Sequence, residues 1–151
     1  MSDSNDGQWY DQGLRFQCTQ CGNCCTGPPG YVWCDDREAQ TLAAHLGLTV
    51  AEFRRRYAHQ AHGRWTLNEQ WNEQVHGYDC VFLRRDPVSG KALCSVYEHR
   101  PNQCRTWPFW ELNLQSHAHW HRAARDCPGM NTGRFYPVEQ VRVLRDRTPP
   151  M

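Results

Sequence analysis

Hydrophobic positions recur at helical spacing over residues 36–46. The apolar residues of this segment stand at i, i+3, i+4 and i+7, namely Ala39, Leu42, Ala43 and Leu46. Asp35 or Asp36 can cap the start, and Gly47 stands where a left-handed glycine ends many helices. The pattern therefore predicts an amphipathic helix from Asp36 to Leu46.

A second helix is predicted directly after the first. Thr49 followed by Glu52 has the capping-box pattern, in which each side chain binds a backbone N–H near the other residue. We expect this helix to run through about Ala61 and to bury one face, formed by Val50, Phe53 and Tyr57. Because only Gly47 and Leu48 separate the two segments, they are expected to form a helical hairpin.

Short strands are predicted in the middle of the chain. Residues 64–67 are typical of one strand, and residues 80–83 and 92–94 of a small hairpin. The sequence Asp-Pro-Val-Ser-Gly at residues 86–90 is rich in turn formers and would connect the two strands of that hairpin.

Two further helical segments follow towards the C-terminus. Residues 96–104 can form one helical turn or two, interrupted by Pro101. Residues 139–147 are expected to form a final helix after Pro137.

Histidines alternate with other residues between Leu112 and His121, which predicts a strand with a slip in phase near Ser116. A strand would put His117, His119 and His121 on one face. Three imidazoles on a face can bind zinc, copper or iron, although such a set is more often a solvated polar face.

Composition indicates an unusual interior. The chain has 151 residues and no isoleucine, and Leu, Val and Phe supply 24 residues, below the roughly 20% that ordinary globular chains have. A net charge of +1 argues against disorder, which pairs low hydrophobicity with strong charge. Seven Trp, six Tyr and nine Cys must hold the fold instead. We expect an α+β fold: a small, irregular, cysteine-rich single domain over residues 14–147, organised around a metal or iron–sulfur site and preceded by a disordered tail, residues 1–13.

Several classes of protein are excluded by the sequence. No apolar run approaches the roughly 18–20 residues that span a bilayer, so no membrane partner is expected. The polar, acidic residues 1–13 lack the apolar core of a secretory signal, which predicts a cytoplasmic, reducing location. Seventeen basic residues are matched by 16 acidic ones, so a nucleic-acid partner is not expected.

The strongest chemical signal is a run of four cysteines in eight residues, Cys18-x2-Cys21-x2-Cys24-Cys25. Thiolates this close together repel unless a cation neutralises them, so the run predicts a metal or cluster site. The spacing resembles that of bacterial ferredoxins, in which a remote cysteine before a proline completes the ligation, as Cys127 before Pro128 would here. Because adjacent side chains diverge, Cys24 and Cys25 are not both expected to serve one compact site.

Further motifs follow the cysteine run in a defined order. They are Cys80-Val-Phe-Leu, then Cys94-x2-Tyr-x-His-Arg-Pro-x2-Cys104-Arg-x-Trp-Pro-Phe, and finally Cys127-Pro-Gly. Over roughly residues 14–130 the chain resembles the CxxCxxCC cysteine-cluster family, whose members are described as candidate zinc or iron chelators. The resemblance implies metal ligation by the cysteines that match the pattern, namely Cys18, Cys21, Cys24, Cys25, Cys80, Cys94, Cys104 and Cys127. Cys34 lies outside this pattern and is expected to be a buried core thiol.

Arg100 and Arg105 flank the cysteine at position 104. Cations stabilise anionic thiolate clusters, so both arginines are candidates for cofactor-binding residues around the ligands. The alternative is that they pair with acids such as Glu98 or stack on Trp107.

Three hypotheses for the function remain open. The favoured one is a protein that binds an iron–sulfur cluster or iron and has a redox, electron-transfer or metal-handling role, with a redox protein as a possible partner. The second is a structural zinc domain that acts as a protein-interaction module, and the third is a metal-dependent enzyme of unknown substrate. The histidines between residues 117 and 121 are the only support for the third hypothesis, because a catalytic metal needs an open coordination site.

Overall fold

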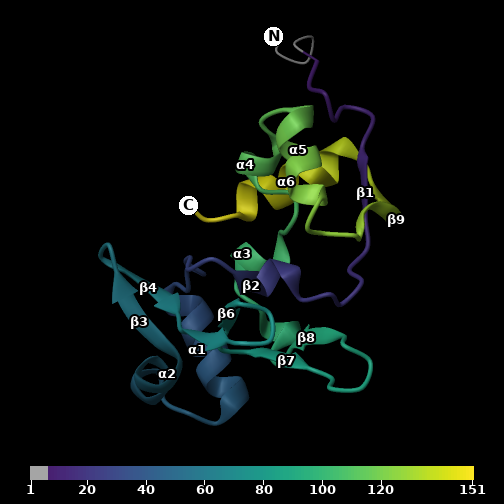
Figure 1. The fold of residues 1–151 in the computed structure, drawn as a ribbon. Coiled ribbons are helices and arrows are strands. Elements are labelled where there is room, and N and C mark those ends of the chain that lie inside the picture. Colours follow the sequence, from purple (N-terminus) through teal and green to yellow (C-terminus); the bar gives the residue numbers. More distant parts are fainter. Residues whose placement is uncertain (1–6) are drawn as a thin grey trace. The chain divides into compact units, whose positions relative to one another are not determined.

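The computed structural model describes residues 7–151, which adopt a mixed α+β fold of six α-helices and nine short strands. This confirms the predicted fold class. The chain folds as two compact units, one made of the described residues up to Thr19 together with Thr106–Met151, the other of Gln20–Arg105. We call them the terminal unit and the central unit. Figure 1 shows the elements of each.

The central unit contains the predicted helical hairpin. Helix α1 (Asp36–Leu46) begins at a capping box between Asp35 and Glu38, and it ends at Gly47 in the left-handed conformation. Helix α2 (Val50–Tyr57) begins at the predicted capping box between Thr49 and Glu52. The two helices pack against each other and are joined by an ion pair of 2.6 Å between Arg54 Nη2 and Asp36 Oδ1.

Helix α2 is shorter than predicted, because residues 58–61 belong to a strand. Strand β3 (Ala58–Ala61) pairs with β4 (Arg64–Leu67), so the strand predicted at 64–67 is confirmed. His62 and Gly63 connect the two strands, both with positive φ, of 53° and 74°. A two-residue turn of this kind matches the twist of a hairpin, and it therefore stabilises the strand over continued helix.

The remaining strands of the central unit form two small sheets. Strands β2 (Thr26–Gly27), β6 (Gly77–Cys80) and β5 (Glu69–Asn72) form one sheet in that order. Strands β7 (Leu83–Arg85) and β8 (Ala92–Cys94) form the other, a hairpin. The predicted hairpin is therefore confirmed, but its first strand starts at Leu83. Cys80, the first residue of the predicted strand, is instead the last residue of β6, which pairs with β5.

The turn between β7 and β8 is built on one carboxylate. Asp86 accepts hydrogen bonds from the Val88 N–H at 2.9 Å and from the Ser89 hydroxyl at 2.8 Å. Val88 at the tip is 94% exposed. After β8 the chain forms two short helical turns, η3 (Tyr97–His99) and α3 (Asn102–Arg105), as predicted for this segment.

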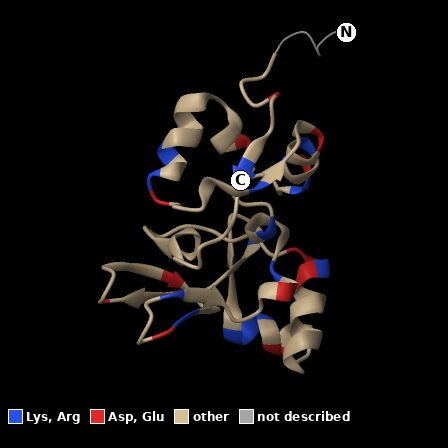
Figure 2. Ribbon diagram, turned by 90° about the vertical axis from the view of Figure 1, so that its right-hand side faces the viewer, with Lys and Arg blue, Asp and Glu red and all other residues tan. Residues whose placement is uncertain are grey.

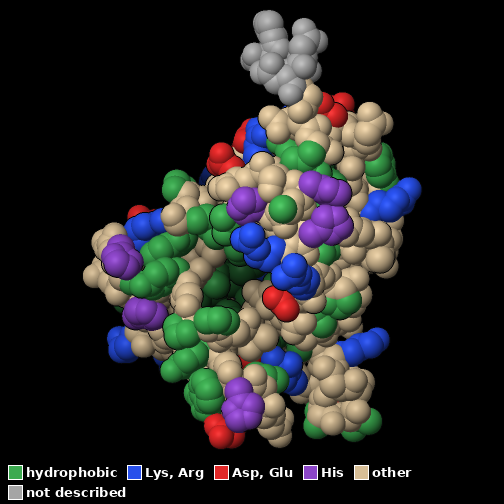
Figure 3. Space-filling view, turned by 45° about the horizontal axis from the view of Figure 1, so that its top comes forward, with side chains coloured by type: hydrophobic (Ala, Val, Ile, Leu, Met, Phe, Trp, Pro, Cys, Tyr) green, Lys and Arg blue, Asp and Glu red, His purple; other side chains and the backbone are tan. Residues whose placement is uncertain are grey.

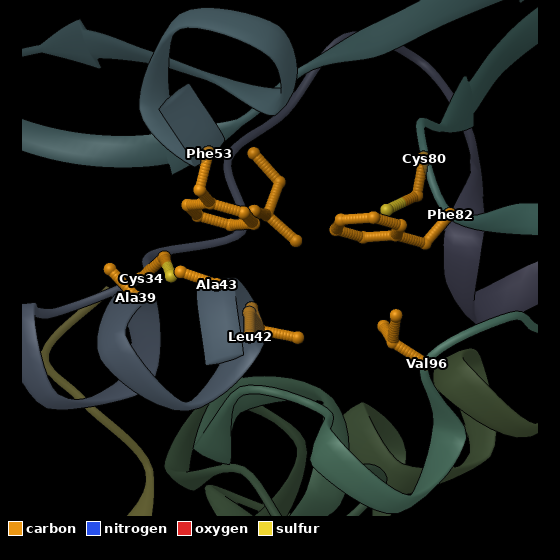
Figure 4. Packing of buried hydrophobic residues seen from close by; sticks show 9 residues of the cluster. Cys34, Ala39, Leu42, Ala43, Phe53, Cys80, Phe82 and Val96 are labelled. Carbon is orange, nitrogen blue, oxygen red and sulfur yellow. The ribbon is translucent and has the colours of Figure 1, made fainter. Parts of the chain in front are cut away.

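The hydrophobic core of the central unit lies between the helical hairpin and the strands. Phe53 of α2 and Phe82 stack with ring centroids 6.4 Å apart, and Figure 4 shows both rings together with Leu42 and Val96. Two cysteines, Cys34 and Cys80, belong to the same cluster of buried residues. The core of this unit thus contains thiols as well as hydrocarbon.

The terminal unit pairs the two ends of the chain. Strand β1 (Leu14–Phe16) runs antiparallel to β9 (Met130–Tyr136), as Figure 1 shows. The unit also contains α4 (Glu111–Leu114), α5 (His117–Ala124) and α6 (Val138–Arg147). Helix α6 confirms the helix predicted after Pro137.

The strand predicted from Leu112 to His121 is wrong, because this segment is helical. Ser116 separates α4 from α5 and caps α5, its hydroxyl accepting the His119 N–H at 3.2 Å. The cap explains the phase slip in the sequence pattern, since it marks the end of one helix and the start of the next. The three histidines consequently do not share one face.

Aromatic rings dominate the core of the terminal unit. Its buried residues are Tyr10, Phe109, Leu114, Trp120, Cys127, Met130 and Val141. Tyr10 lies within the tail predicted for residues 1–13; it is only 3% exposed, and its neighbour Trp9 donates a hydrogen bond of 2.8 Å from Nε1 to the Leu114 carbonyl. Residues 1–6 of that tail lie outside the described residues.

Charged residues of both signs are distributed along the chain, and Figure 2 shows basic and acidic residues interspersed on the same elements. None of the helices described between residues 7 and 151 is long and apolar enough to cross a membrane.

Candidate metal centre

The loop that carries the cysteine run is held by a glycine and by the β7–β8 hairpin. Gly22 has φ +79°, and a Cβ at this position would lie 2.6 Å from the Ala92 Cβ. The Gln20 carbonyl accepts the Ala92 N–H at 2.6 Å. Glycine is required here because the backbone is left-handed and another strand lies against it. The loop from Gln20 to Cys25 is therefore fixed onto β8, the strand that ends at Cys94.

Cys24 and Cys25 lie close together, contrary to the prediction that they diverge. Both belong to the 3-10 turn η2 (Asn23–Cys25), and their Sγ atoms are 3.8 Å apart. Their shared hydrogen bond, aided by Arg100, lowers the pKa of Cys24 to about 7 against the effect of burial. The same hydrogen bond, together with burial, raises the pKa of Cys25. When the pair loses a proton, the negative charge therefore falls on Cys24 and Cys25 stays protonated.

Three of the thiols accept a backbone N–H from the residue two positions later. The Asn23 N–H lies 3.4 Å from Cys21 Sγ. The Phe82 N–H binds Cys80, and the Val96 N–H binds Cys94. Donors of this kind stabilise a sulfur that carries negative charge.

Cys104 is brought to the other thiols by long-range hydrogen bonds around α3. The buried Gln103 side chain accepts the Trp33 N–H at 2.9 Å and donates to the Tyr31 carbonyl at 2.7 Å. The Asn102 N–H donates to Glu38 Oε2, and the other oxygen of this carboxylate closes the capping box of α1. These contacts fix the position and rotation of α3, and with them the direction of Cys104.

Five thiols from four elements of the central unit influence each other electrostatically. They are Cys24, Cys25, Cys80, Cys94 and Cys104. Burial raises the pKa of Cys80 to about 11, and the charges of Cys94 and Cys24 act in the same direction. Burial, followed by the charges of Cys80, Cys94 and Cys24, raises the pKa of Cys104. Buried thiols stay protonated unless a cation compensates their charge, which is what a coordinated metal does.

Arg100 is a cation whose charge acts on three of these thiols. Its charge lowers the pKa of Cys24 and opposes the raised pKa values of Cys94 and Cys104. The guanidinium carbon lies 3.8 Å from the centre of the Tyr97 ring, and Nε donates to the Tyr97 carbonyl at 2.9 Å. Arg100 is thus held in place and contributes positive charge to the sulfurs.

Arg105 acts on the backbone. Its Nη2 donates to the Glu98 carbonyl at 2.9 Å and contacts the Arg100 carbonyl at 3.5 Å. The sequence left open that Arg105 pairs with the Glu98 carboxylate or stacks on Trp107. The contacts that Arg105 makes through Nη2 are instead with backbone carbonyl groups. Arg105 fixes the segment that carries Arg100.

The donor chemistry of the thiol group fits zinc or iron, both of which bind thiolate sulfur in proteins. Among residues 7–151, however, no three Cys, His, Asp or Glu side chains are close enough to surround one metal ion as they stand. Ligation would thus require the other thiols of the group to turn towards a common centre with Cys24 and Cys25, whose Sγ atoms are already 3.8 Å apart.

Cys18, Cys127 and Cys34 have different surroundings from these five thiols. Cys18 and Cys127 belong to the terminal unit, where Gln17 N–H donates to the Gly129 carbonyl at 3.0 Å. A Cβ at Gly129 would lie 3.5 Å from the Cys18 Cα, so the Cys-Pro-Gly segment passes close to Cys18. Cys34 is 2% exposed in the central core, as predicted, and burial raises its pKa to about 12.

Sequence reasoning missed the residues that position the thiols. The N–H donors at Phe82 and Val96 have a signal, since each stands two residues after a cysteine that ends a strand. Gln103 and Glu38 have no such signal, because their partners are 64 to 72 residues away along the chain.

Comparison with known proteins identifies the family. No solved structure matches the chain. A family model matches residues 17–128, a range that includes all nine cysteines, and its description is "Putative zinc- or iron-chelating domain". The match covers most of the chain and supports metal binding as its function. The chain belongs to the CxxCxxCC family.

Proposed function

We propose that the central unit binds iron through its grouped cysteines, as an iron–sulfur cluster or as an iron ion, and that it has a redox, electron-transfer or metal-handling role. Family membership supports the coarser statement that the protein binds metal. The observation that carries the proposal is the pair of Cys24 and Cys25, whose Sγ atoms are 3.8 Å apart, together with Cys80, Cys94 and Cys104, whose charges affect the pKa values within the same group of thiols.

The surroundings of the thiols favour iron in a cluster over a single metal ion. A structural zinc ion and the common iron–sulfur clusters each take four protein ligands, so the five grouped thiols and the adjoining Cys21 are enough for either, and the surroundings of the sulfurs must favour one of them. Hydrogen bonds to sulfur and nearby positive charge are features that set the reduction potential of iron–sulfur clusters. When bound, such a cluster supplies one-electron chemistry, and a protein that exchanges electrons with it is the expected partner.

In this proposal the residues of the chain have separate roles. Cys24, Cys25, Cys80, Cys94 and Cys104 are the candidate ligands, with Cys21 as a sixth. Phe82 and Val96 contribute N–H groups to the sulfurs and apolar side chains that exclude water from one side of the group. Arg100 balances negative charge, and Arg105 positions Arg100.

A structural zinc site is the second candidate. Cys80 and Cys94 each end a strand and accept an N–H from the residue two positions later, and a zinc thiolate is stabilised by the same donors. In that case the metal would stabilise the fold, and the function would lie on a protein-binding surface. The enzyme hypothesis was supported by a predicted strand of three histidines, and these residues lie in helix α5 instead.

The seven cysteines of the central unit form no disulfide. Thiols of this kind persist in reducing compartments, which is consistent with the proposed cytoplasmic location.

Metal analysis of anaerobically purified protein tests the proposal. We expect a coloured protein with iron and acid-labile sulfide, whose content falls in the Cys104→Ser variant. The Cys34→Ala variant is the matched control, because it removes a buried thiol that lies outside the group and should keep its metal. A colourless protein with stoichiometric zinc would support the second candidate and contradict the first, and equal metal loss in both variants would contradict a site at the five thiols.

A further inference from the structure

Helix α5 carries two histidines that lie side by side outside the thiol group. The ring centroids of His117 and His121 are 4.3 Å apart, with an angle of 63° between the ring planes. Both side chains are exposed. Their spacing of four residues is one helical turn, so the rings project from the same face. Histidine side chains at the surface are seen in Figure 3.

The orientation of the helix keeps this face turned outwards. Trp120 lies on an adjacent side of α5, is 1% exposed, and donates from Nε1 to Asn131 Oδ1 at 2.8 Å. Because Trp120 is fixed in the core, α5 cannot rotate to bury the histidine pair. The N-cap at Ser116 fixes the start of the helix and therefore its register.

The His117 ring is also supported from its side. The Trp9 ring lies with its centroid 5.2 Å from that of His117, and Trp9 is itself held by the bond from Nε1 to the Leu114 carbonyl. A side chain that is already restrained loses less conformational entropy when it binds a ligand. His117 is therefore partly pre-ordered for ligation.

His119 has a different environment although it lies between the two. Its Nδ1 is 2.7 Å from the Ser116 hydroxyl, and helical geometry directs its ring away from the pair. The structure thus contains a matched control, a third histidine on the same helix whose side chain is already engaged.

We propose that His117 and His121 form a two-imidazole site for a divalent late transition-metal ion, with water completing the coordination. Imidazole nitrogen suits zinc, copper and nickel, and neighbouring rings on one helical turn can direct a nitrogen to a common ion. The site is separate from the thiols in chemistry and in sequence, and it does not depend on their metal.

Nickel titration of the protein as isolated, with its own metal in place, tests this site. In proton–nitrogen spectra of the imidazole rings at pH 7.5, paramagnetic Ni²⁺ should broaden the signals of His117 and His121 at lower concentrations than those of the other six histidines. Equal broadening of His119, or earlier broadening of His45 and His99, whose rings are 4.2 Å apart, would overturn the proposal.

Binding measurements on variants complete the test. Loss of an outer partner of a metal ligand costs about 10–100-fold in affinity, so removing one of two ligands should weaken Ni²⁺ binding at least about tenfold. We expect this loss in His117→Ala and in His121→Ala, and an unchanged affinity in His119→Ala. The iron, zinc and sulfide contents of all three variants should match the parent protein, which separates this outcome from that of the thiol site. Unchanged Ni²⁺ affinity in His121→Ala would refute it.

Discussion

The hydrophobic cores of the two units differ in composition. The terminal unit fills its core with rings: Phe109 stacks on Trp120 at 5.8 Å and contacts Tyr136 at 4.8 Å between centroids. The central unit combines the apolar face of a helical hairpin with sulfur, since Cys80 lies in its core and Cys25 and Cys94 pack against it. The first interior is mostly aromatic and aliphatic and includes one thiol, that of Cys127, whereas the second borders a group of thiols whose charge state depends on what they bind.

This difference teaches where a metal would contribute to stability. Where metal ligands line a hydrophobic core, metal binding stabilises the folded state, because the ligands come together only when the core is packed. In the central unit the candidate ligand Cys80 belongs to the same buried cluster as Phe82, and Figure 4 shows both, so metal binding at Cys80 would involve a residue of the core. The terminal unit has its own cluster of buried aromatic residues.

The largest expected effect follows from metal removal by a chelator. Thiolate metal sites contribute about 10–16 kcal/mol to folding in small zinc peptides, which exceeds any single packing contact. Hydrogen exchange should therefore rise in residues 20–105, most of all around the grouped cysteines, and change less in residues 106–151. If hydrogen exchange rose first in the terminal unit, this would contradict the expectation that the metal stabilises mainly the central unit.

Truncation of an aromatic side chain should affect the terminal unit without affecting metal content. Trp120→Ala removes a 1% exposed ring, and such changes destabilise a core by about 3–5 kcal/mol. The free energy of unfolding in urea measures the loss, and metal analysis should give the parent value. Trp71→Ala is the control, since this ring is 51% exposed and surface changes usually stay within about 0.5 kcal/mol.

A pair of glycine variants separates backbone strain from damage to the thiol group. Gly22→Ala forces an alanine into φ +79° and against Ala92, so metal content should fall along with stability. Gly63→Ala imposes a similar φ of +74° in open space, and it should cost only the roughly 1–2 kcal/mol of a left-handed alanine. Metal analysis and thermal melting of both variants check this. Equal metal content in the two variants would show that the loop at Gly22 does not position the ligands.

The smallest effect concerns the capping glutamates of the hairpin. Burial raises the pKa of Glu38, although N–H groups of Asn102 and Asp35 act against it. The folded protein then holds this proton to higher pH than the unfolded chain, so the contribution of Glu38 to stability falls as pH rises from its ordinary pKa to the raised one. Glu38→Gln should therefore gain stability relative to the parent as pH rises through this interval.

The second capping box supplies the control with the opposite sign. Hydrogen bonds from Thr49 lower the pKa of Glu52, so its contribution grows as pH rises from the lowered pKa to the ordinary one. Glu52→Gln should therefore lose stability relative to the parent over that interval. Unfolding free energies between pH 3 and 7 measure both differences, and slopes of the same sign would contradict the assignment of burial to Glu38.

Local signals in the sequence were sufficient for the elements that have local causes. Capping residues and Gly47 predict both ends of α1 and the start of α2, because these contacts span only a few residues. The end of α2 was missed because the turn at His62 and Gly63 stabilises a competing hairpin. The alternating histidines led to a wrong strand prediction, because Ser116 caps a new helix and the apolar pattern on its two sides belongs to two different helices.

The candidate site was predicted in its chemistry but not in its grouping. Residue type and spacing identify the cysteines, since thiolates at such spacing are expected to meet a cation. Which of them meet depends on long-range contacts such as those of Gln103 with Tyr31 and Trp33, which no local pattern encodes. That Cys18 and Cys127 belong to the terminal unit is likewise a property of the fold that no local pattern encodes.

The turn at residues 86–90 offers a practical route to spectroscopy on this molecule. Nine native thiols rule out ordinary maleimide labelling, but Val88 is almost fully solvated and its loop is closed by the Asp86 carboxylate. Loop tips of this kind tolerate insertions and bulky substituents. A fluorophore introduced at Val88 through an unnatural amino acid would sit at the end of the hairpin that leads to Cys94, where quenching by a bound ion can be read without altering any sulfur.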